Sequence, residues 1–125
     1  KKNIIRRAGE NISSAEVEAA LLSLEIVKNC ATIAFPHEIY EEEVFAFIVV
    51  KDSKNISKIK AQNILNLLIK KISYYKLPGY IQFTNYIPIT STQKIVKSEL
   101  LKKIKLEDKS KLFDLCDYKK LLKTN

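Results

Sequence analysis

A polar loop near the C-terminal end of the chain contains the residue types that could act on an anion. Pro88 opens a stretch rich in threonine and serine, and the stretch ends at Lys94. Such loops often carry function because they lie at the surface, where a ligand can reach them. A lysine ammonium stays protonated at neutral pH, and its long stem can reach a site where negative charge develops. Lys94 is one of 22 basic residues, so its type alone does not distinguish it from a surface cation.

Few other side chains offer chemistry. His37 is the only histidine, so a Ser-His-Asp triad or a histidine-rich metal site has little material. Cys30 and Cys116 have neither CxxC spacing nor a neighbouring histidine, and we expect ordinary reduced thiols. The chain also has an acidic cluster, which consists of Glu38, Glu41, Glu42 and Glu43. Because hard-cation sites usually interleave their ligands with a turn glycine, we expect a solvated loop there and no metal ion.

Length and charge limit the classes of protein. A chain of 125 residues with 46% apolar content is enough for one domain with a modest core. The net charge of +8 allows nucleic acid, an anionic membrane or a phosphate-rich ligand as a partner. Aromatic residues do not interleave with the basic ones as in base-stacking proteins, so we expect no nucleic-acid partner. We also expect no membrane span and no export signal, and hence a cytoplasmic location.

The N-terminal part of the chain predicts a strand, a turn and a capped helix. Residues Ile4–Arg7 indicate a short strand that turns at Gly9. Ser13 with Glu16 three positions later forms a capping-box pattern, which predicts a helix ending near Leu24.

The rest of the chain alternates strand and helix patterns. Runs of small and branched apolar residues predict strands, and apolar residues at helical spacing predict helices. The expected strands are Cys30–Phe35, Val44–Val50 and Tyr80–Thr84, and the expected helices are Ile56–Ile72, Lys97–Ile104 and Lys109–Leu122. This mixture indicates an α+β fold.

Three segments together resemble one family. The loop Pro88–Ile95, read P-I-T-S-T-Q-K-I, looks like the terminal signature P-x-T-x-[ST]-G-K-[IV] of adenylate-forming enzymes. The opening Lys2–Ser13 is similar to the hinge-and-loop motif of that superfamily, and Tyr75–Pro78 resembles its F/Y-K-x-P segment. The triplet Gly9–Asn11 resembles the G-E-N of acyl-CoA ligases, including the carnitine and crotonobetaine ligase group, more than the G-x-R of peptide-synthetase adenylation domains.

The resemblance implies a fold and a domain organisation. The fold would be α+β, a small mixed sheet flanked by helices with an N-terminal two-stranded hairpin. Residues 1–105 would form the C-terminal lid domain of an adenylate-forming enzyme, with a hinge near residue 2, and residues 106–125 would be an unmatched tail that we expect to be helical. The large N-terminal domain that binds ATP and the acyl group would lie outside these residues.

The resemblance also implies an AMP-forming acyl-CoA ligase reaction. A carboxylate and ATP give an acyl-adenylate and pyrophosphate, and CoA then gives acyl-CoA and AMP. The substrates would be a carboxylic acid, CoA and ATP with Mg²⁺, and the partner would be the chain's own N-terminal domain. We expect the 125 residues alone to be inactive.

Site residues follow from the matched motifs. Lys94 would be the adenylation lysine and Lys2 the hinge. The residues on the CoA side would be Gly9, Glu10, Tyr40, Tyr75 and Lys76, and Thr90, Thr92 and Gln93 would support the lysine loop. Gln93 replaces the usual glycine and Lys97 a usual arginine, whereas Leu77 and Gly79 stand where some relatives have basic residues for CoA phosphates.

Two other classes of function remain open from the sequence. A stand-alone CoA- or phosphate-binding module without catalysis would need the same loops but no partner domain. A nonspecific nucleic-acid binder would rest on the net charge alone and predicts steep salt dependence.

Overall fold

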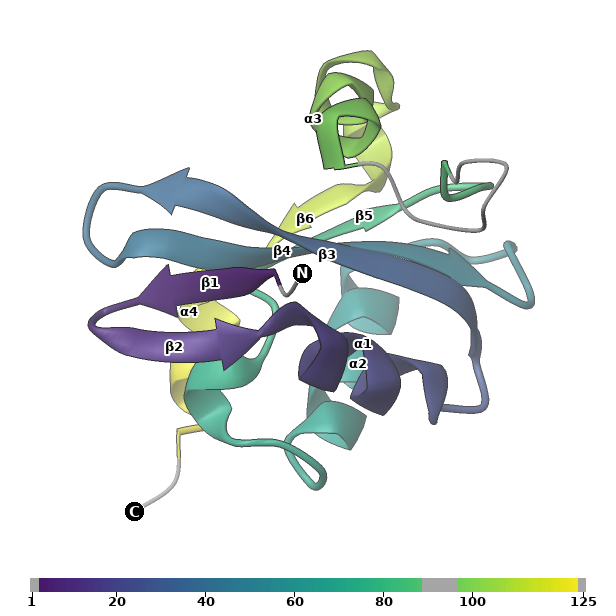
Figure 1. The fold of residues 1–125 in the computed structure, drawn as a ribbon. Coiled ribbons are helices and arrows are strands. Elements are labelled where there is room, and N and C mark those ends of the chain that lie inside the picture. Colours follow the sequence, from purple (N-terminus) through teal and green to yellow (C-terminus); the bar gives the residue numbers. More distant parts are fainter. Residues whose placement is uncertain (1–2, 89–96, 124–125) are drawn as a thin grey trace.

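The fold is seen in a computed structural model that describes residues 3–88 and 97–123 (Figure 1). The predicted roles of Lys2 and Lys94 lie outside the described residues. The same holds for the loop-support residues Thr90, Thr92 and Gln93, and for the side chain of Lys97.

The chain begins with the expected two-stranded hairpin. Strands β1 (Ile4–Arg7) and β2 (Glu10–Ser13) are antiparallel, and Ile5 lies opposite Ile12. Both isoleucines are buried. The turn residues Ala8 and Gly9 have φ angles of 50° and 83°. A two-residue hairpin turn with positive φ at both positions matches the twist of the strands, which is why the glycine lies there.

Helix α1 (Ser14–Leu22) follows directly. The Ser13 hydroxyl accepts a hydrogen bond of 3.2 Å from the Glu16 backbone N–H, so the predicted N-cap is confirmed. Val17 and Leu21 are buried on one face. The helix ends two residues before the expected Leu24.

Two long antiparallel strands form the middle of the sheet. Strands β3 (Val27–His37) and β4 (Glu41–Val50) extend beyond the predicted runs at both ends of the turn that joins them. Pro36, expected between the strands, lies inside β3. In the described part of the chain β3 pairs only with β4, so the missing N–H of Pro36 can face the unpaired edge.

A crossover connection makes the sheet mixed, as expected. Helix α2 (Lys58–Leu68) and the short 3₁₀ helix η1 (Tyr74–Lys76) lead from β4 to strand β5 (Tyr80–Phe83), which runs parallel to β4. The path through the sheet is β2-β1-β4-β5 and then β6, with β3 paired to β4. Helix α2 is shorter than predicted at both ends. It begins after Ser57, which caps it by accepting a hydrogen bond from the Lys60 N–H, and it ends four residues before the expected Ile72.

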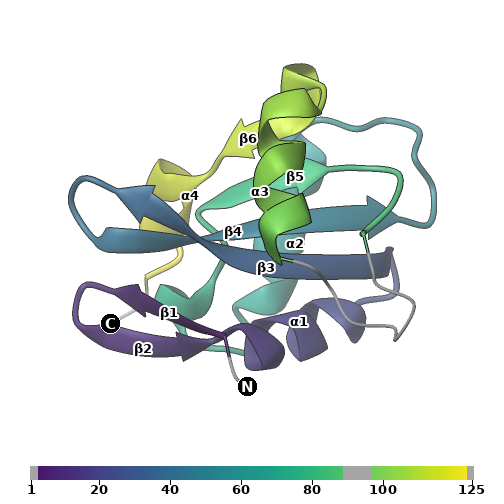
Figure 2. The same ribbon diagram turned by 45° about the horizontal axis from the view of Figure 1, so that its top comes forward.

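The central strand β4 is buried on both faces, as its unbroken apolar run indicates. Its residues Val44, Ala46, Ile48 and Val50 join the core that contains α1 and α2, and Phe45, Phe47 and Val49 join a second core. Helix α3 (Lys97–Leu106) adds Leu100 to the second core. Figures 1 and 2 show α3 crossing the face of the sheet opposite to α1 and α2.

The C-terminal segment differs from its prediction. The single helix expected over Lys109–Leu122 is wrong in its first half, which forms a 3₁₀ turn η2 (Lys109–Lys111) and strand β6 (Leu112–Asp114). Strand β6 pairs antiparallel with β5 and covers its open edge. Only α4 (Cys116–Leu121) is helical in the second half. Pairing with the edge of β5 therefore decided the structure of residues 112–114, against the helical pattern of the local sequence.

Candidate functional site

Three of the predicted CoA-side residues lie at one end of the sheet. The turn between β1 and β2 contacts the turn between β3 and β4, because the Ala8 N–H donates to the Tyr40 carbonyl over 2.9 Å. Gly9 and Glu10 are therefore near Tyr40. The two turns lie side by side at the left in Figure 1. Gly9 and Glu10 are both exposed.

Gly9 is explained by its backbone conformation. Its φ of 83° is unfavourable for residues with a side chain, whereas no atom lies within 4 Å of the position that a Cβ would take. The turn thus accounts for the glycine, and the open space beside it is compatible with a ligand. Its role next to pantetheine stays a prediction.

Tyr40 already has two planar partners in its own chain. Its ring stacks on His37 with centroids 4.8 Å apart, and the Arg7 guanidinium carbon lies 4.0 Å from its centroid. Both groups occupy stacking positions that an adenine would need.

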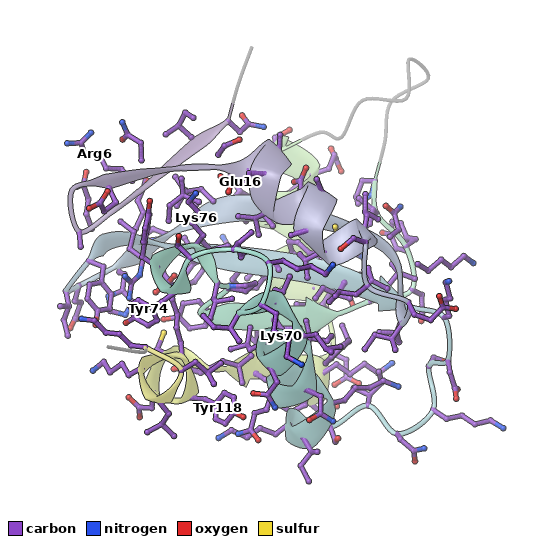
Figure 3. The ribbon with its side chains drawn as sticks, turned by 90° about the horizontal axis from the view of Figure 1, so that it is seen from below. Arg6, Glu16, Lys70, Tyr74, Lys76 and Tyr118 are labelled. Carbon is purple, nitrogen blue, oxygen red and sulfur yellow. The ribbon has the colours of Figure 1, made fainter. Side chains whose placement is uncertain are left out.

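Tyr75 and Lys76 lie in a second group on η1, which an ion pair joins to α1. Both oxygens of the Glu16 carboxylate accept hydrogen bonds from the Lys76 ammonium, at 2.9 and 2.8 Å. The hydrogen bond to Glu16 raises the pKa of Lys76. Tyr75 packs against the core below. Figure 3 views this side and labels Tyr74 and Lys76 on η1 with Glu16 on α1.

Arg7 connects the two groups. Its guanidinium stacks on Tyr40 at one end of the sheet and donates a long hydrogen bond of 3.5 Å to the Tyr74 hydroxyl on η1. Arg7 is only 4% exposed. Gly9, Glu10 and Tyr40 are thereby linked to the segment that carries Tyr75 and Lys76. Sequence reasoning did not identify this link.

The centre of the link is Glu43, and the prediction that it lies in a solvated loop is wrong. Its side chain is completely buried and accepts hydrogen bonds of 2.8 Å from the Arg7 Nε, the Lys119 Nζ and the Val44 N–H. The other three members of the acidic cluster differ, since Glu38 and Glu41 are exposed and Glu42 accepts a hydrogen bond from the Arg6 N–H. Glu43 belongs to a strand whose following residues are all buried, which explains its burial.

Lys119 of α4 is the second buried ion of this cluster. Besides Glu43, its ammonium donates to the carbonyls of Tyr75 (3.1 Å) and Leu77 (2.6 Å). Burial lowers the pKa of Lys119 to about 8, against the opposing charge of Glu43. For Arg7, burial also acts to lower the pKa, but the hydrogen bond and charge of Glu43 outweigh it and the pKa is raised. The sequence signal was the spacing of Lys119 from the apolar Leu115 one helical turn earlier, and only the structure shows that Leu115 is buried.

The two ends of the loop that contains Lys94 are held by a separate cluster. Lys103 on α3 is 4% exposed, pairs with Glu107 and lies 3.6 Å from the centroid of Tyr86. The Thr84 hydroxyl, just after β5, donates to Glu107 over 3.1 Å. A groove of about 230 Å³ beside this cluster is lined by Tyr86 and Pro88. These contacts tie the chain before the loop to the helix after it.

Metal binding and membrane crossing find no support in residues 3–88 and 97–123. No group of three or more histidine, cysteine, aspartate or glutamate side chains is placed to hold a metal ion within these ranges. None of the described helices has the length and apolar character that a membrane span needs.

Comparison with known proteins agrees with the motif resemblance. The chain is 37% identical over 79 residues to acetyl-coenzyme A synthetase 2-like, mitochondrial, from Homo sapiens, which covers 63% of this chain and 12% of that protein. It is 36% identical over 82 residues to probable CoA ligase CCL11 from Humulus lupulus, with 66% of this chain and 14% of that protein covered. The chain therefore spans only a small part of the length of these relatives.

Solved structures agree with the same assignment. A Mycobacterium tuberculosis fatty acyl CoA synthetase matches with a TM-score of 0.72 and 31% identity, over 81% of this chain and 19% of that one. A Brucella canis acyl-CoA synthetase matches with a TM-score of 0.74 and 27% identity, over 83% of this chain and 19% of that one. The expected fold is confirmed. The family model of the AMP-binding enzyme C-terminal domain matches residues 16–94, and the chain belongs to this family.

Proposed function

We propose that this chain is the mobile C-terminal domain of an AMP-forming acyl-CoA ligase. The observation that carries the proposal is the family match, which reaches Lys94 in the loop that resembles the family's terminal signature. In this proposal residues 1–105 form the lid, residue 2 lies at the hinge, and residues 106–125 are an added tail. ATP with Mg²⁺ and the acyl group bind to a preceding N-terminal domain.

The chemistry of the first half-reaction explains the need for Lys94. Joining a carboxylate to the α-phosphate of ATP concentrates negative charge, and a fixed cation stabilises it. The ammonium of Lys94 supplies that charge from the lid. Gln93 in place of glycine reduces the backbone freedom of the loop without removing the cation.

The arrangement of the sheet supports two separate working ends. Strand β4 begins at Glu41, beside Arg7 and the Gly9 turn. Strand β5 runs parallel to β4 and ends level with Ile48, far along β4 from that turn. The chain that follows β5 and leads to the Lys94 loop therefore leaves the sheet at the end opposite to that turn (Figure 1). Rotation of the domain about its hinge can then present one end for adenylation and the other for CoA.

The CoA end would use Gly9, Glu10, Tyr40, Tyr75 and Lys76. An adenine would stack on Tyr40 only after displacing His37 or Arg7 from its ring. Lys76 has its charge neutralised by Glu16, which reduces its value for a CoA phosphate unless the ion pair opens. Because the pair is partly exposed, opening it costs about 1 kcal/mol or less. The identity of the acid, including a carnitine-type acid, depends on the preceding domain.

The alternative of a stand-alone CoA- or phosphate-binding module is not favoured, since the family match includes the lysine loop as well as the core of the domain. Titration of the 125-residue chain with CoA tests it. Binding without a partner domain would support the module.

The test of the proposal is Lys94→Ala in the full-length protein. Acid-dependent exchange of pyrophosphate into ATP should fall about 100-fold or more, because one preorganised charge is lost at the reacting phosphate. Conversion of supplied acyl-adenylate and CoA to acyl-CoA should persist. The exposed Lys102→Ala, on α3, serves as the control and should leave both steps unchanged. An equal loss of both half-reactions in Lys94→Ala contradicts the assigned role.

A further inference from the structure

The buried ions Arg7, Glu43 and Lys119 connect three segments that are distant in sequence. Glu43 lies at the start of β4, Arg7 at the end of β1 beside the Gly9 turn, and Lys119 on α4. Their side chains are 5%, 0% and 0% exposed for Arg7, Glu43 and Lys119. Burying two or more ions is costly unless the remaining hydrogen bonds are made. The Lys119 ammonium makes three hydrogen bonds, and the Arg7 guanidinium bonds to Glu43 and to the Tyr74 hydroxyl.

The hydrogen bonds of Lys119 are directed at the segment Tyr75–Leu77. Its Nζ reaches the carbonyls of Tyr75 and Leu77 and one oxygen of Glu43, which uses the three protons of the ammonium. The backbone carbonyls on both sides of Lys76 are therefore hydrogen-bonded to Lys119 of α4. The other oxygen of Glu43 holds Arg7, next to the Gly9 turn.

Gly79 provides the space for this arrangement. A Cβ at Gly79 would lie 2.4 Å from Cγ and 2.6 Å from Cδ of Glu43. The Gly79 N–H donates to the Val44 carbonyl, so the backbone after η1 is anchored beside Glu43. The Glu43 side chain thus fills the space that a side chain at residue 79 would need.

We propose that Lys119 is a positioning residue for the CoA side of the domain, which it aligns through Glu43. Lys119 fixes the position of η1, which carries Tyr75 and Lys76, relative to the Gly9 turn. The connection runs from Lys119 to Glu43 and from Glu43 to Arg7, which lies beside that turn. The C-terminal segment, expected from the sequence to be an unmatched tail, thus acts on the thioester-forming step. This inference rests on the proposed function, because it assigns Lys119 to the CoA half of the ligase reaction.

The test compares Lys119→Met with Lys120→Met in the full-length protein, since Lys120 is exposed on the same helix. Lys119→Met should raise the KM for CoA roughly tenfold, because misplacement of a binding segment by about 1 Å can cost up to ~10²-fold. Pyrophosphate exchange should stay within about twofold of the parent, since the chain leaves β5 towards Lys94 at the other end of the sheet. Lys120→Met should change neither quantity.

Hydrogen exchange provides a readout that is independent of catalysis. In Lys119→Met the amides of Lys76, Leu77 and Gly79 should exchange faster than in Lys120→Met, because the carbonyls of Tyr75 on η1 and of Leu77 just after it each lose a hydrogen bond from the ammonium. If the full-length parent forms no acyl-CoA, the proposed function fails, and the exchange rates alone decide whether Lys119 positions η1. Unchanged exchange at Lys76, Leu77 and Gly79 overturns the inference.

A second variant keeps the test decisive where Lys119→Met does not fold. Arg7→Met and Glu43→Gln together with Lys119→Met remove all three buried charges, so none is left uncompensated. It should show the same selective rise in the KM for CoA. A purely structural role predicts lower stability with an unchanged KM for CoA at temperatures where the variant is folded, or an equal loss of both half-reactions, and either result overturns the inference.

Discussion

At the scale of single residues, the charge of Lys119 depends on pH in an accessible range. Burial lowers its pKa from the ordinary 10.5 to about 8 in the folded protein, while the Glu43 carboxylate acts in the opposite direction. Between pH 8 and 10.5 the unfolded chain therefore holds a proton that the folded protein has lost. Raising the pH disfavours the state with more bound protons, so this lysine makes stability increase through that window.

The prediction is a difference between two proteins. The free energy of unfolding of the parent, minus that of Lys119→Met, should be flat below about pH 8 and increase from pH 8 towards 9, with the sign given by the extra proton of the unfolded state. Urea unfolding at several pH values measures it, with Lys120→Met as the control that keeps the parent's slope. A difference in unfolding free energy that stays flat up to pH 9 would show that the pKa of Lys119 is not lowered in the folded protein.

The cysteines explain why the difference is needed rather than the parent curve alone. Burial raises the pKa of Cys30 and of Cys116 to about 12. Their thiols ionise first in the unfolded chain, so above the ordinary thiol pKa of 9.0 they lower stability as the pH rises. This effect opposes that of Lys119. The contribution of Cys30, which is not among the groups that act on Lys119, cancels in the comparison. Both cysteines are free, as expected, and burial keeps them in the unreactive thiol form.

At the scale of elements, side-chain contacts connect α3 to the chain that follows β5, on either side of residues 89–96. Lys103 on α3 pairs with Glu107 just after the helix, and the Thr84 hydroxyl after β5 donates to the same carboxylate. Glu107→Ala should leave the Lys103 ammonium buried and poorly paired and should cost about 1–3 kcal/mol of local stability. In the full-length protein we expect slower pyrophosphate exchange and an unchanged KM for CoA.

The matched control for that variant is Glu99→Ala, which removes an exposed partner of Lys102 on the same helix. Exposed pairs contribute about 0–1 kcal/mol, so this change should be nearly silent in unfolding and in both half-reactions. Should Glu107→Ala alter the KM for CoA and leave pyrophosphate exchange untouched, the assignment of α3 to the adenylation end would be wrong.

Element boundaries were predictable where a local signal sets them. Ser13 caps α1 through its own hydroxyl, and Ala8–Gly9 turns through its backbone, so both depend only on neighbouring residues. The segment Leu112–Asp114 became a strand because the edge of β5 lies beside it. That edge is formed by residues about thirty positions away, and no window of the sequence contains both.

At the scale of the whole molecule, the proposed mechanism needs a rotation between two orientations. In the full-length protein Lys2→Pro would fix φ near −65° at the proposed hinge and favour one orientation. The ratio of the two half-reaction rates should then change by about tenfold or more, which corresponds to ~1.4 kcal/mol between the two barriers. Stopped-flow measurement of pyrophosphate release and of acyl-CoA formation gives both rates.

A control for the hinge variant is Lys1→Ala, which removes a neighbouring charge without restricting the backbone. It should leave the ratio unchanged. Equal rates in Lys2→Pro and the parent would place the hinge elsewhere.

The sequence by itself determined the family, the order of most elements and the candidate residues, because motifs, caps, turns and apolar periods are local patterns. Only the tertiary structure decided that Glu43 is buried and that Arg7 and Lys119 meet it. These residues are separated by 36 and 76 positions from Glu43, and local patterns carry no record of which distant charges pair. The pairing depends on the register of β1 against β4 and on the packing of α4, and both arise when the sheet and its cores assemble.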